Sequence, residues 1–197
     1  LDATDNIKTI LAASRKSGLI PDNMNIEITN DMSDNVKSQV SNLENSIIMG
    51  MIFVITVLFF FLGFRNALFV GLAIPMSMLI SFVVLGFLGY TVNMMILFGL
   101  VLALGMLVDN AIVVVENVYR FIGKGYTVFE AARQGVGEIA WPIIASTATT
   151  LAAFLPLIFW PGMVGSFMGL LPKTLIIVLT SSLFVALVIV PTFIVLT

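Results

Sequence analysis

The chain has 197 residues, of which 59% are hydrophobic and 10% are charged, and its net charge is -2. Soluble globular domains carry about a quarter of their residues as charges, so this composition excludes a soluble single domain. The small net charge excludes a nucleic-acid-binding surface, and the absence of Cys and His excludes disulfides, thiolate or imidazole metal sites and Ser-His-Asp catalysis. We therefore expect no enzyme activity, no metal and no cofactor.

The charges are distributed unevenly along the chain. Eleven of the 20 charged residues lie in residues 1–44, and nine lie in the remaining 153. This contrast predicts a hydrophilic segment, residues 1–43, followed by a membrane-embedded segment, residues 44–197. The chain begins at Leu1 and stops inside an apolar run, so we interpret it as an internal fragment of a longer protein.

The hydrophilic segment has the pattern of mixed secondary structure. It predicts a helix over about 3–17, a turn over 18–23 and a strand over 24–29. Residues 31–44 predict a polar helix that leads into the first membrane span. A helix followed by a strand is typical of the end of an α+β extramembrane domain.

Uncharged runs locate the membrane spans, because a helix crosses the hydrocarbon core with about 20 apolar residues. The runs after Glu44, Arg65, Glu138 and Lys173 contain 20, 43, 34 and 24 residues. Turn residues at 89–93 divide the second run, and Trp, Pro and Gly at 160–162 interrupt the third. The predicted fold is mostly α, a polytopic transmembrane helix bundle with five spans, at about 44–64, 67–89, 93–119, 138–160 and 172–197.

The cations predict the orientation of the bundle. Arg65 lies in the first connection, and Arg120, Lys124 and Arg133 lie in the third, so the positive-inside rule places both connections in the cytoplasm. Residues 1–43 then lie outside the cytoplasm.

The third connection contains a helix signal of its own. Thr127 and Glu130 have the spacing of a capping box, which predicts a short amphipathic helix over about 127–137 along the membrane face. We interpret it as a surface helix in preference to a regulatory element.

Asp109 is a carboxylate inside a predicted span, about 16 residues or roughly 24 Å along the helix axis from the start of the third span. An isolated charge at this depth costs a few kcal/mol, so Asp109 should face the bundle interior with a partner. A separation of seven residues places Asp109 and Glu116 on one helix face, and Asn110 and Asn117 on an adjacent face.

Two interpretations of Asp109 remain open. It can be a proton carrier, because burial favours the protonated acid whereas a nearby cation favours the carboxylate. It can instead anchor a neighbouring helix through a fixed hydrogen bond. We favour the first, since ionisable groups inside membranes are usually functional. Glu116 lies near the end of the span, four residues before Arg120, and we interpret it as a helix-end ion pair.

Small and hydroxylated residues accompany the polar residues of the third span. Gly99, Ala103 and Gly105 permit close helix approach. Thr147 belongs to a group of hydroxyls in the fourth span, which can bond to their own helix carbonyls or hydrate a proton path. The 11 Met residues are interpreted as apolar gap-fillers and not as a soft-metal path.

Several segments resemble one transporter family. Residues 89–93, Gly-Tyr-Thr-Val-Asn, and residues 98–118, which contain Val-Asp-Asn-Ala, closely resemble the fourth transmembrane helix of resistance-nodulation-division efflux pumps. The similarity is to the hydrophobe/amphiphile efflux branch of the acriflavine-resistance type. Residues 65–75 resemble the connection between its second and third helices, and residues 130–142 and 154–156 resemble the segment from its fourth helix to its fifth.

The resemblance implies a position in a larger assembly. The five spans would be helices two to six of a twelve-helix protomer, and residues 1–43 the end of a periplasmic α+β porter domain. The family implies proton antiport across the bacterial inner membrane, driven by the proton gradient, with export of small amphiphilic substrates and multidrug resistance. It also implies a homotrimer in the lipid bilayer that docks a periplasmic adaptor protein and an outer-membrane channel, with no role for nucleic acid.

The resemblance also assigns residues. Asp109 matches the first of two adjacent carboxylates of the proton relay, and Asn110 occupies the position of the second, which is a departure from members with two Asp. The relay's lysine lies on a helix outside this chain. Apart from the resemblance, the positions of Glu116, Asn117, Gly105 and Thr147 make them candidates for a supporting role beside Asp109. Two alternatives stay open: a related transporter with another cargo, such as a lipid, a metal ion or an exported protein, or a membrane scaffold without transport.

Overall fold

In the computed structural model of the chain, all regular structure in the described residues is helical, which confirms the prediction of a mostly α fold. The chain separates into two compact units, Leu1–Ser41 and Asn42–Thr197. The residues that the structure describes are 2–21, 24, 26 and 33–196.

The first unit contains helix α1, Asp2–Lys16, close to the predicted 3–17. The helix is followed by Gly18, whose φ of 73° lies in the left-handed region that glycine adopts without strain. The Leu19 amide then donates to the Ser14 carbonyl at 3.1 Å, which satisfies one of the last carbonyls of the helix. The predicted strand over 24–29 lies mainly outside the described residues.

Helix α2, Ser33–Leu62, joins the predicted polar helix and the first span without a break. Its N-terminal turns are polar, and the window Asn35–Phe60 is apolar enough to cross a membrane. The helix stops at Gly63, which has a φ of 81°, and the next helix begins one residue later.

The described residues contain five helical stretches that are long and apolar enough to span a membrane, which is the predicted number. Their lengths follow from the uncharged runs of the sequence, and their packed faces form the apolar core. The stretches after α2 are built from α3 (Phe64–Phe87), α4 (Met94–Leu104), α5 (Leu107–Gly123), α6 (Val128–Ile158), α7 (Gly162–Met168), α8 (Leu170–Phe184), a π-helix η1 (Val185–Ile189) and α9 (Val190–Leu196).

The helix predicted over 127–137 is not a separate element. The capping box that predicts its start is present, since Thr127 Oγ1 accepts from the Glu130 amide at 3.3 Å and Glu130 Oε2 accepts from the Thr127 amide at 3.4 Å. The helix then continues through the fourth span to Ile158. Gly135 and Gly137 do not break it, and Pro142 and Pro156 each remove only one hydrogen bond, so the fourth span begins at Val128 instead of residue 138.

The last span begins earlier than the predicted residue 172. Pro161 and Gly162, which has a φ of 86°, form the turn after α6, and α7 starts immediately. Gly165 packs against this turn, since a Cβ there would lie 1.8 Å from the Trp160 carbonyl oxygen. The sequence up to Lys173 is apolar, so the chain re-enters a helix as soon as the turn is complete.

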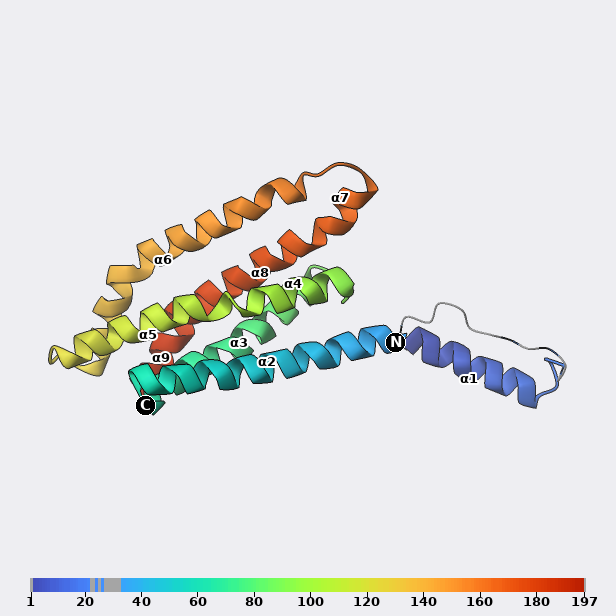
Figure 1. The fold of residues 1–197 in the computed structure, drawn as a ribbon, viewed down its shortest axis with the longest axis horizontal. Coiled ribbons are helices and arrows are strands. Elements are labelled where there is room, and N and C mark those ends of the chain that lie inside the picture. The colour runs from blue at the N-terminus through green and yellow to red at the C-terminus, as the bar shows by residue number, and fades with distance from the viewer. Residues whose placement is uncertain (1, 22–23, 25, 27–32, 197) are drawn as a thin grey trace. The chain divides into compact units, whose positions relative to one another are not determined.

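Helix α8 packs against α3, α4 and α6 within the second unit, and Figure 1 shows it running beside α6. Helix α8 lies close to α4 at Gly99, where a Cβ would lie 3.1 Å from the Cβ of Thr174. Gly99 and the fully buried Ala103 therefore act as the small packing residues predicted from the sequence.

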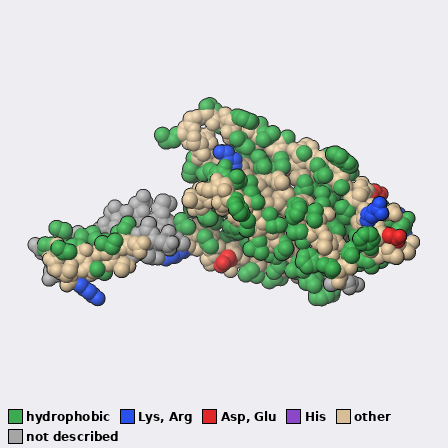
Figure 2. Space-filling model, turned by 180° about the vertical axis from the view of Figure 1, so that it is seen from behind, with side chains coloured by type: hydrophobic (Ala, Val, Ile, Leu, Met, Phe, Trp, Pro, Cys, Tyr) green, Lys and Arg blue, Asp and Glu red, His purple; other side chains and the backbone are tan. Residues whose placement is uncertain are grey.

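The surface of the second unit is largely apolar. Figure 2 shows hydrophobic side chains over most of the visible face, and several charged side chains gathered at the end where α5 meets α6. Such an apolar surface with charges at helix ends is what a membrane-spanning bundle requires.

Candidate functional site

The third span is interrupted just before Asp109. The sequence predicts one helix over 93–119, whereas the structure has α4 ending at Leu104 and α5 beginning at Leu107. The start is as predicted: Asn93 caps α4, and its Oδ1 accepts from the amides of Met95 and Ile96.

The interruption is a short turn at Gly105. The Met106 amide donates to the Ala103 carbonyl at 2.8 Å, three residues back instead of four. Glycine inside a helix costs about 1 kcal/mol relative to alanine, which favours a break at this position. A Cβ on Gly105 would meet only the Leu102 carbonyl, at 4.0 Å, so Gly105 marks the helix break and not a close packing contact.

Asp109 consequently lies in the first turn of α5. The N-terminal amides of a helix have no intrahelical partners, and the helix dipole favours a negative charge there. The side chain is exposed, and it has no hydrogen bond or ion pair with any residue that the structure describes. The expectation that Asp109 is enclosed with a partner is therefore not met by the helices of this chain.

A small polar cavity adjoins Asp109. Its volume is about 130 Å³, and a water in a polar cavity needs roughly 10–15 Å³, so it has space for several waters. It is lined by Met106, Asp109, Asn110, Ser146, Thr147, Thr150 and Leu179.

Asn110 links α5 and α6, two of the helices that line the cavity. Its Nδ2 donates to Thr147 Oγ1 at 3.4 Å, and Thr147 is buried on α6. Thr150 donates instead to the Ser146 carbonyl of its own helix at 3.1 Å. The hydroxyl oxygens keep lone pairs that can accept further hydrogen bonds. The cavity therefore combines an ionisable group with neutral donors and acceptors.

The predicted division of α5 into two polar faces is confirmed. Asn110 and Asn117 both contact α6, whereas Asp109 and Glu116 are both exposed. The two exposed carboxylates lie on the face that the other helices of this chain leave uncovered.

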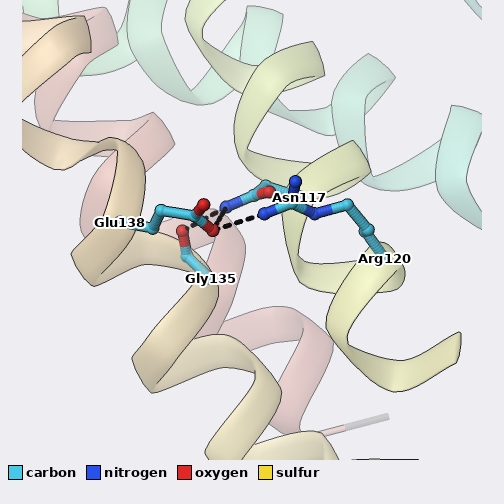
Figure 3. Close-up of polar contacts among 4 residues, drawn as sticks. All are labelled: Asn117, Arg120, Gly135 and Glu138. Atoms are coloured by element: carbon cyan, nitrogen blue, oxygen red, sulfur yellow. Dashed lines mark hydrogen bonds and ion pairs between the residues drawn. The ribbon is translucent and has the colours of Figure 1, made fainter. Parts of the chain in front are cut away.

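A second polar cluster lies near the far end of α5 (Figure 3). Asn117 is 8% exposed, and its Nδ2 donates to the Gly135 carbonyl at 2.7 Å and to Glu138 Oε2 at 3.3 Å. Arg120 forms an ion pair with the same carboxylate oxygen. The helices approach closely here, because a Cβ on Gly135 would lie 3.1 Å from Val118 Cα.

This cluster corrects the interpretation of Glu116. The predicted ion pair with Arg120 is absent from the described residues, because the guanidinium is engaged by Glu138 on α6. Sequence reasoning missed Gly135 and Glu138, which it treated as the end of a connection. The sequence offered one signal for this cluster: a small residue, Gly135, lies three positions before a carboxylate, Glu138.

Comparison with known proteins agrees with this architecture. A sequence model of the AcrB/AcrD/AcrF family matches residues 1–196, which is nearly the whole chain. The five apolar helical stretches and the charged residues at helix ends are those of a multi-pass membrane protein. The chain therefore belongs to the AcrB/AcrD/AcrF family of resistance-nodulation-division transporters.

Proposed function

We propose that this chain forms part of a proton-driven efflux transporter in which Asp109 carries the proton. The observation that carries the proposal is the position of Asp109, in the first turn of a helix within a membrane span and beside a polar cavity. The structural alternative, a fixed helix anchor, is disfavoured because no described residue is bonded to this carboxylate.

The arrangement suits a reversible proton carrier. In the ionised state, the helix N-terminus and the water that the cavity can hold stabilise the carboxylate. In the protonated state, placing the neutral acid in apolar surroundings costs far less free energy than placing the carboxylate there. Protonation therefore changes the free energy of exposing this face of α5 to lipid or to another helix, which couples the proton to helix movement.

Asn110 would have a positioning role. Its amide does not titrate, so a site with Asp109 and Asn110 carries one proton where two adjacent carboxylates could carry two. The hydrogen bond to Thr147 orients the Asn110 amide toward α6 beside the cavity. A cation that stabilises ionised Asp109 would come from a helix outside this chain and would approach the uncovered face that also carries Glu116.

The family membership supports a wider proposal about the assembly. The chain would supply helices two to six of a twelve-helix protomer in the bacterial inner membrane, with residues 1–43 on the periplasmic side. Three protomers would work with a periplasmic adaptor and an outer-membrane channel to expel small amphiphilic compounds, which gives multidrug resistance.

The test uses the complete transporter subunit in cells that lack other pumps. Asp109→Asn should abolish efflux of a fluorescent amphiphilic dye driven by a pH gradient, because the amide cannot release a proton. Glu116→Gln is the matched control, since it also removes an exposed carboxylate of α5 but lies near the helix end, and it should retain most of the efflux. Undiminished efflux by Asp109→Asn at equal protein level would show that this carboxylate is not the carrier.

A further inference from the structure

A groove lies between the start of α6 and the last helical segment of the chain. Its volume is about 550 Å³, more than four times that of the cavity beside Asp109. The walls are mainly apolar and include Phe129, Val136 and Gly137 from α6, and Val188 and Pro191 from η1 and α9. It is separate from the Asp109 cavity, with which it shares no lining residue.

The sequence of the last span explains why the groove exists. Pro191 has no amide hydrogen to donate to the Leu187 carbonyl, and the preceding turn is the π-helix Val185–Ile189. Across from it, Gly137 has no side chain, and a Cβ there would meet no atom within 4 Å. A widened helix therefore faces a residue without a side chain, and the space between them stays open.

The length of the groove matches one leaflet of a bilayer. From Phe129 to Gly137, α6 advances eight residues, or about 12 Å at 1.5 Å per residue. The hydrocarbon thickness of one leaflet is about 15 Å. The groove begins at the end of the bundle that carries Arg120 and Lys124, which the positive-inside rule assigns to the cytoplasm.

Arg133 is the one charged side chain in the wall of the groove among the described residues. It is exposed, and it forms no hydrogen bond or ion pair with any residue in the described part of the chain. The neighbouring cations differ: Arg120 is paired with Glu138, and the Lys124 Nζ lies 4.9 Å from the centre of the Phe121 ring. The groove thus combines apolar walls with a positive charge that no described residue pairs with, at the end of the bundle that the positive-inside rule assigns to the cytoplasm.

We propose that this groove binds one anionic phospholipid, with an acyl chain along the apolar walls and the phosphate paired with Arg133. A basic pocket between transmembrane helices on the cytoplasmic side suits an acidic headgroup, because anionic lipids are concentrated in that leaflet. An apolar helix in the same groove would cover the walls but leave the Arg133 charge uncompensated in the membrane. A phospholipid supplies both the apolar chain and the anion.

The test titrates phosphatidylglycerol and phosphatidylethanolamine against the complete transporter subunit and counts retained lipids by native mass spectrometry. Phosphatidylglycerol should be retained in preference. Arg133→Gln should weaken its apparent affinity about fivefold, as expected for loss of one cation near an acidic headgroup. Gly137→Leu should abolish the retained molecule, because the new side chain occupies the open part of the groove.

Two matched variants separate this site from general lipid binding. Lys124→Gln removes a charge at the same end of the bundle but outside the groove, and Gly86→Leu fills an equally open helical position on α3. Both should retain phosphatidylglycerol as the parent protein does. Retention that survives Gly137→Leu, or that falls equally with Lys124→Gln and Arg133→Gln, would overturn the proposal.

Discussion

Replacing Asn117 by Leu removes the two hydrogen bonds that join α5 to α6 beside their close contact at Gly135. The amide donates to the Gly135 carbonyl at 2.7 Å and to Glu138 Oε2 at 3.3 Å. Leu has the same number of side-chain heavy atoms and the same branching, so the change removes polar contacts without leaving a cavity. Hydrogen bonds between membrane helices contribute about 0.6 kcal/mol on average and up to about 1.7 kcal/mol. Two such bonds predict a loss of about 1–2 kcal/mol in the free energy of unfolding, or a 5- to 30-fold change in the unfolding equilibrium.

The measurement is unfolding of the complete subunit in mixed micelles, titrated with sodium dodecyl sulfate and followed by circular dichroism. Asn110→Leu is the matched control, because Asn110 is half-buried and donates one bond of 3.4 Å, at the limit of hydrogen-bond length. It should change the unfolding free energy by less than about 0.5 kcal/mol. An equal loss for the two variants would refute the idea that the Asn117 bonds hold α6 against α5.

Three other substitutions test local packing and capping. Gly165→Ala should lower the unfolding free energy by about 1–3 kcal/mol, because its Cβ would overlap the Trp160 carbonyl oxygen. Gly137→Ala is the control, since the space around Gly137 is open. It should be neutral or raise the unfolding free energy by up to about 1 kcal/mol in the same titration. Thr127→Ala should cost about 1 kcal/mol through loss of the capping box with Glu130, and hydrogen exchange at the first turn of α6 should rise; unchanged exchange would contradict the assigned cap.

The spans were predictable because their signals are local. A run of apolar residues long enough to cross a bilayer identifies a membrane helix wherever it packs. The start of α4 at Asn93 and the start of α6 at Thr127 were predictable for the same reason, since a cap bonds to amides two or three residues away. The turn at Trp160, Pro161 and Gly162 was also recognised from its own residues.

The candidate site was predictable in part. A separation of seven residues predicted that Asn110 and Asn117 share a face, and both contact α6. The break at Gly105, which places Asp109 in the first turn of a helix, was not predicted. Glycine lowers helix stability by only about 1 kcal/mol, so packing decides whether the helix continues through it or stops.

The sequence by itself determined the number of spans, the caps at Asn93 and Thr127 and the isolation of Asp109 from the other charges, because these depend on composition and on residues within about one helical turn. Only the tertiary structure decided that Arg120 pairs with Glu138 instead of Glu116, and that a groove opens between Gly137 and Pro191. Arg120 and Glu138 are 18 residues apart on different helices. Their contact depends on how closely α5 and α6 pack at Gly135, and no helical periodicity encodes that distance.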